Sequence, residues 1–83
     1  MVYFYLYHFM KDQKKLLIKC LGNEIPAFVI CGTDICALET LQHYYQVALR
    51  NECNPAFLED LKLMIEDFKQ FQEEEPDKVK RPD

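Results

Sequence analysis

The chain has 83 residues, of which 49% are hydrophobic and 29% charged, and its net charge at pH 7 is -4. The apolar content excludes a disordered protein, and the 2 glycines and 4 prolines exclude a fibrous or low-complexity one. A chain of this length buries a limited share of its surface. We therefore expect one small domain, and chains of this size usually gain further stability from disulfides, a metal or self-association.

Charge is unevenly distributed along the chain. Residues 1–33 carry four lysines and two acidic side chains, whereas residues 34–72 carry seven acidic and three basic ones. Binding to nucleic-acid phosphates needs clustered Lys and Arg, so the acidic part argues against a direct nucleic-acid partner. The first ten residues are too short to span a bilayer and lack the basic leader of a signal peptide. We expect a cytoplasmic protein with no membrane partner.

Three short apolar segments predict β-strands. Residues 2–10 are dense in aromatic side chains, residues 16–22 resume an apolar run, and residues 27–31 (AFVIC) are typical of a buried strand. The turn before the third segment contains Gly22 and Asn23, which tolerate positive φ. The pattern predicts a three-stranded antiparallel meander.

The first predicted strand is rich in tyrosine. In an extended segment the side chains on one face are those of Tyr3, Tyr5, Tyr7 and Phe9. Such rings suit a contact with a second chain, or they stack on a nucleotide whose phosphate Lys15 or Lys19 neutralises. The alternative is a strand that is buried on both faces, with each hydroxyl hydrogen-bonded.

After Gly32 the apolar spacing changes from two to about 3.6, which predicts a helix that ends near Asn51. Thr33 or Asp34 is the expected N-cap. A second helix is predicted to follow Asn54 as N-cap and Pro55 as first helical residue.

The second helix carries apolar residues with spacings of 4, 3, 4 and 3, namely Phe57, Leu61, Met64, Phe68 and Phe71. This seam is expected to pack on the first helix, on the sheet, or on a partner in self-association. The resulting fold class is α+β, a meander followed by a two-helix hairpin packed on one of its faces. Residues 1–72 form the single domain, and residues 73–83 are expected to be a disordered charged tail.

Acidic pairs recur every seven residues on the second helix and form a possible docking stripe, consisting of Glu59, Asp60, Glu66 and Asp67. A basic protein could dock there, although an ordinary solvated helix face has the same pattern.

Little in the sequence indicates catalysis. The four cysteines, Cys20, Cys31, Cys36 and Cys53, lack the close pairing of a zinc knuckle and are expected to be buried thiols, with a redox pair or a metal site as alternatives. Glu39 and His43 lie one helical turn apart, as on any solvated helix, and the chain contains no serine. We expect no enzyme, no cofactor and no metal.

Residues 25–45 (IPAFVICGTDICALETLQHYY) resemble a recurrent pattern in short uncharacterised proteins of phages, prophages and bacterial mobile elements. The matching positions are Phe28, Gly32, Asp34, Ala37, Glu39, Thr40, Leu41 and Tyr45, with Phe71 further on. The resemblance covers residues 25–72. Cys31 stands where those proteins have a basic residue, and Leu38 stands where proline is common. The resemblance implies a small accessory protein that acts by binding, and it transfers no activity and no functional residue.

The function expected from the sequence is that of a non-catalytic binding protein of a phage or mobile element. It would act as a homo-oligomer, a dimer or larger, through protein–protein contacts. The alternatives are sequestration of a small nucleotide signal, and acidic-surface mimicry that blocks a host defence protein.

Overall fold

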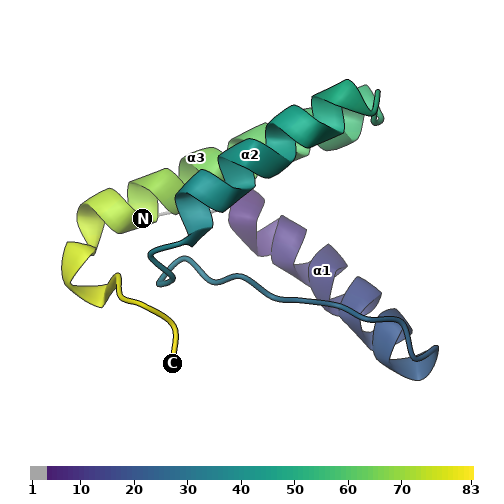
Figure 1. Cartoon of the computed structure of the whole chain (residues 1–83), viewed down its shortest axis with the longest axis horizontal. Helices are drawn as coiled ribbons and strands as arrows, with labels where there is room; N and C mark the ends of the chain where they lie inside the picture. Colours follow the sequence, from purple (N-terminus) through teal and green to yellow (C-terminus); the bar gives the residue numbers. More distant parts are fainter. Residues whose placement is uncertain (1–3) are drawn as a thin grey trace.

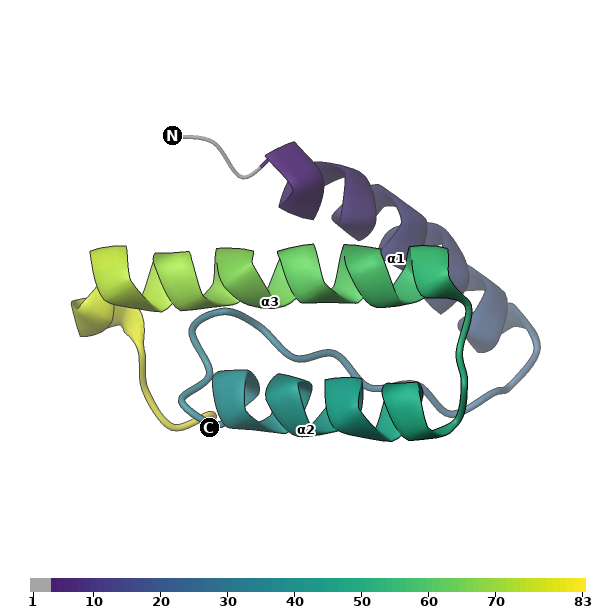
Figure 2. The same cartoon turned by 90° about the horizontal axis from the view of Figure 1, so that it is seen from above.

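The computed structural model describes the backbone of residues 4–83 and the side chains of residues 12–83. Its elements are α1 (Phe4–Gly22), α2 (Ala37–Arg50), α3 (Pro55–Glu74) and a short 3-10 helix, η1 (Pro76–Lys78). Helices α2 and α3 lie side by side as an antiparallel hairpin (Figures 1 and 2). Helix α1 begins beneath this hairpin and contacts α3, and its C-terminal end points away from it (Figure 1).

Residues 4–83 form no β-sheet, so the predicted meander and the α+β class are wrong. The first two predicted strands lie in α1, as far as they are described, and residues 27–31 are an irregular segment. Short apolar runs do not distinguish a strand from a helix, and the connector 11–15 consists mostly of good helix formers, through which α1 continues. Residues 27–31 have strand-like composition, but no neighbouring strand pairs with them.

The core lies between α2 and α3. Its buried side chains are those of Ala37, Ala48, Leu61, Met64, Ile65 and Phe68. The two alanines leave room on α2 for the larger side chains of α3. The seam predicted for self-association is therefore occupied within the chain: its three middle members are buried here, and Phe57 and Phe71 are half-buried.

The start of α3 confirms the sequence prediction. The Oδ1 atom of Asn54 accepts a hydrogen bond of 2.8 Å from the backbone N–H of Ala56, and Pro55 is the first helical residue. The prediction for α2 is wrong, because its N-cap is Cys36, which makes no side-chain cap. The Asp34 carboxylate instead accepts a hydrogen bond of 2.7 Å from the N–H of Cys36, so it shapes the turn before the helix.

Helices α1 and α2 end in the same way, with an Asn-Glu pair. Asn23 and Asn51 each donate a side-chain hydrogen bond of 2.8 Å to the carbonyl four residues earlier. The next residues, Glu24 and Glu52, adopt the left-handed region with φ of 56° and 53°. The residues expected from the sequence were Gly22 and Asn23, which tolerate positive φ, and Asn51 at the end of the first predicted helix. None of these three has a positive φ.

Backbone hydrogen bonds complete a Schellman motif at both helix ends. At the end of α2, the N–H of Cys53 donates to Ala48 at 3.1 Å and the N–H of Glu52 donates to Leu49 at 3.0 Å. At the end of α1, the N–H of Ile25 donates to Cys20 at 2.8 Å. This motif needs a left-handed residue at the position where glycine is usual. Glutamate occupies that position in both helices.

Residues 75–80, the C-terminal strap, follow a defined path in the segment predicted to be disordered. The N–H of Lys80 donates to Thr33 and the N–H of Ile35 donates to Lys80, both at 2.9 Å. Close by, the side-chain amide of Gln72 donates to the carbonyl oxygens of Gly32 and Asp34 at 3.0 and 3.1 Å. These bonds join the end of α3 to the turn before α2.

The left-handed Glu52 predicts an outcome for stability. Replacing Glu52 with Gly removes the Cβ that disfavours this conformation, so we expect E52G to raise the free energy of unfolding by about 0.5–1 kcal/mol. Glu52→Ala removes the same carboxylate but keeps the Cβ, and it serves as the matched control. Urea denaturation of both variants measures the difference. Equal stability of E52G and E52A would contradict the backbone explanation.

Candidate interaction surface

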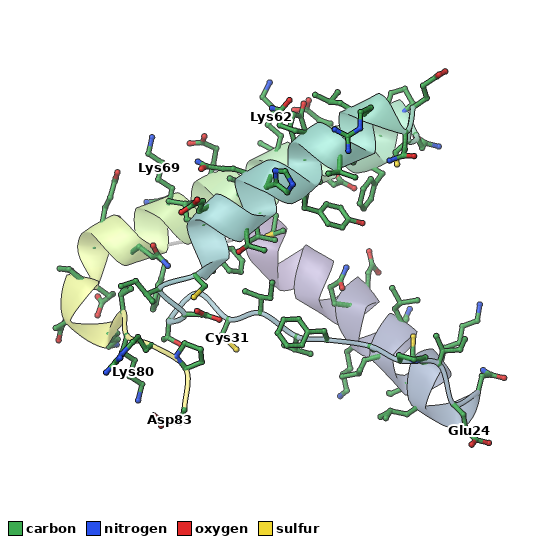
Figure 3. All side chains as sticks on the ribbon, in the orientation of Figure 1. Glu24, Cys31, Lys62, Lys69, Lys80 and Asp83 are labelled. Carbon is green, nitrogen blue, oxygen red and sulfur yellow. The ribbon has the colours of Figure 1, made fainter. Side chains whose placement is uncertain are left out.

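The C-terminal half of α1 and the segment that returns to the hairpin, residues 12–30, are called the arm. Glu24 lies at the far end of the arm, and Cys31 lies where the chain rejoins the hairpin (Figure 3). The arm exposes large apolar side chains, those of Leu16, Ile18, Leu21, Ile25, Phe28 and Val29. Phe28 is 84% and Leu21 71% exposed, the highest values among the large apolar side chains that the structure describes.

The concentration of these side chains distinguishes the arm from an ordinary surface. Single exposed apolar residues are normal in soluble proteins. Outside the arm they are scattered over the described surface at Ile35, Tyr44 and Leu49. On the arm, six follow one another between Leu16 and Val29. This density of exposed apolar side chains makes the arm the candidate interaction surface of the described residues.

The total surface area supports the same interpretation. The chain exposes 6740 Å², whereas a compact monomer of 9.9 kDa exposes roughly 5,200 Å². The radius of gyration is 13.5 Å, against about 12 Å for a compact domain of this length. The chain therefore exposes roughly 1,500 Å² more than a compact monomer of its size.

The residues predicted to bind a ligand are only partly described. Tyr3 lies outside the described residues, as do the side chains of Tyr5, Tyr7 and Phe9. The strand on which this face was predicted is part of α1 from Phe4 onward. Lys15 and Lys19 are described, and with Lys14 they are exposed on the arm.

The predicted acidic stripe on α3 is interrupted by basic residues. Glu59 and Glu66 are exposed, and Lys62 and Lys69, each three residues later, are also exposed and point away from the hairpin (Figure 3). Asp60 is exposed as well. Alternating charges at this spacing are typical of a solvated helix face.

Asp67, which follows Glu66 in the second predicted acidic pair, is half-buried. The four predicted acidic residues therefore do not form one continuous exposed surface.

The turn CGTDIC at residues 31–36 holds exposed thiols rather than buried ones. Cys31 and Cys36 are exposed, Cys20 and Cys53 are half-buried, and all four are free. The nearby Asp34 carboxylate raises the pKa of the Cys36 thiol, with smaller contributions from desolvation and from Glu39. A thiol at the start of a helix is usually activated, because the helix dipole favours the thiolate. Here the carboxylate opposes that effect.

No other described group forms a site for chemistry. Glu39 and His43 are both exposed on α2. Among the described residues, no three His, Cys, Asp or Glu side chains are grouped so that they could hold a metal ion. None of the described helices combines the length and the apolar character needed to cross a bilayer.

Sequence reasoning missed the arm as an exposed surface, because it assigned residues 16–22 and 27–31 to buried strands. One signal was available. Lys14, Ile18 and Leu21 have the spacing of one helix face, and the polar connector at residues 11–15 contains no glycine or proline that would break a helix. Comparison with protein-family models, curated proteins and solved structures finds no match to this chain.

The position of Asp34 predicts the reactivity of Cys36. Removing the carboxylate in Asp34→Asn lowers the pKa of the thiol and increases its thiolate fraction at pH 8. We expect alkylation of Cys36 by iodoacetamide to become about twofold faster or more. Mass spectrometry of the peptide measures the rate, in a Cys31→Ser background that leaves one thiol in the turn. Glu52→Gln, which removes a distant carboxylate, is the control, and an unchanged rate in D34N would contradict the assignment.

Proposed function

We propose that this chain is a non-catalytic binding protein that acts as a homo-oligomer, a dimer or larger, through protein–protein contacts. The observation that carries this proposal is the arm, a segment in which six large apolar side chains are exposed. The alternatives carried by the acidic stripe and by the tyrosines have less support. The stripe is interrupted by lysines, and the tyrosine side chains lie outside the described residues.

The size of the core supports self-association. Among the residues with described side chains, six are buried, they lie between α2 and α3, and no large one is fully buried. A small domain with so limited a core needs a further source of stability. All four cysteines are free, and the described residues offer no metal site. Burial of the arm against another chain supplies the missing apolar contact.

The chemistry of the described residues supports a non-catalytic role. A nucleophile needs a lowered pKa or an adjacent base, and the pKa of Cys36 is raised instead. His43 is exposed on α2. The cellular context is part of the proposal: a cytoplasmic accessory protein of a phage or mobile element, as the pattern in residues 25–72 implies.

Self-association is tested by the mass in solution. We expect light scattering after size-exclusion chromatography to give about 20 kDa or more, at least twice the 9.9 kDa of the chain. The measurement is made across a dilution series in the presence of reductant, so that disulfides between exposed thiols do not contribute. A mass of 9.9 kDa at every concentration would refute the proposed homo-oligomer.

A further inference from the structure

The exposed half of α1 carries a face suited to pack against another helix. Lys14, Ile18, Leu21 and Gly22 lie at positions i, i+4, i+7 and i+8, which share one side of a helix. Ile18 is 58% and Leu21 71% exposed, although both are large and apolar. The alternation of steps of four and three is the spacing by which one helix packs along another.

Gly22 has no reason within the chain to be glycine. Its φ is not positive, and a Cβ at this position would meet nothing within 4 Å. Glycine in a helix costs roughly 0.5–1 kcal/mol relative to alanine. Glycine does, however, permit the close approach of another backbone. Gly22 lies one turn after Ile18, so it would leave room for a neighbouring helix on this face.

We propose that α1 of one copy packs antiparallel against α1 of a second copy, around a two-fold axis, through Ile18 and Leu21. This inference rests on the proposed homo-oligomer and identifies its interface. In a two-fold arrangement, a residue that contacts another is contacted in return by the same residue of the other copy. Ile18 therefore lies opposite Leu21 of the second copy, and Leu21 lies opposite its Ile18.

The charges of the arm favour this orientation. An antiparallel register that places Ile18 opposite Leu21 also places Lys15 opposite Glu24 of the second copy, once on each side of the axis. A parallel arrangement would place Lys14, Lys15 and Lys19 beside the same lysines of the second copy. Like charges at matching positions repel, whereas opposite charges at the rim of an interface fix its register.

The second copy supplies an apolar face and the charges complementary to Lys15 and Glu24. Each chain exposes roughly 1,500 Å² more than a compact monomer of its size. Burial of the arm against a second copy would remove part of this excess.

The apolar contact is tested by a double variant, Ile18→Asp with Leu21→Asp. Both side chains are exposed in the single chain, so the variant is expected to keep its helical circular dichroism. We expect its dimer dissociation constant to rise at least about 100-fold, because two charges on each chain would be buried without partners. Leu49→Asp is the matched control, since Leu49 is 43% exposed on α2, outside the arm. Sedimentation equilibrium measures each constant.

The register is tested independently by charge reversal. We expect Lys15→Glu and Glu24→Lys each to weaken the dimer about 5- to 10-fold, since each creates like-charge contacts at both rims. The double variant, in which each pair is reversed, is expected to bind within about twofold of the original chain. This restoration distinguishes pairing between the two positions from a general effect of charge. The charge-reversal variants also test the α1 pairing if the double aspartate variant fails to fold.

The outcomes separate this inference from the proposed function. A dimer that keeps its dissociation constant in the aspartate variant, or a double charge variant that is as weak as the single ones, overturns the α1 pairing and leaves the homo-oligomer intact. An original chain that stays monomeric overturns the proposed homo-oligomer itself. A large loss in the aspartate variant, together with restoration in the double charge variant, supports the pairing.

Discussion

The packing of α3 on α2 is the contact on which the rest of the structure depends. Small side chains at Ala37 and Ala48 receive the larger ones of α3, and the buried residues of the described chain all belong to this contact. The hairpin is joined at both ends: by a short turn before Pro55, and by the strap and Gln72 at the other end. Helix α1 contacts α3 alone, so the arm is attached to one side of a closed unit.

This arrangement decides which surfaces remain for binding. The apolar face of α3 is used within the chain, because a hairpin of two amphipathic helices must bury that face to be stable. Once α2 covers it, the only strongly apolar part of the described surface is the arm. The charged face of α3 is directed to solvent, and its lysines reduce the net field of its carboxylates. The arm combines exposed apolar side chains with both signs of charge.

The hairpin could be predicted from the sequence, because its signals are local. The arm could not, because its conformation depends on the whole fold. Asn54 and Pro55 act locally, so their roles as N-cap and first helical residue follow from residue type alone. Residues 27–31 favour a strand by composition, but a strand needs a partner, and partners depend on the whole fold. Propensity favours a left-handed conformation at Gly22, Asn23 and Asn51. Main-chain hydrogen bonding instead places the left-handed residues later, at Glu24 and Glu52.

The two glutamates at the helix ends also bear on motion. Each is held in a conformation that disfavours a Cβ, and each places a carboxylate near the negative end of a helix dipole. The last turns of α1 and α2 are thus held less firmly than the helix centres. At the end of α2 the hairpin core resists opening, because Ala48 is buried there. At the end of α1 no such core exists, so amide protons near Cys20 and Leu21 would exchange with solvent ahead of those in the hairpin. Of these two helix ends, we expect the one at the tip of the arm to unwind first.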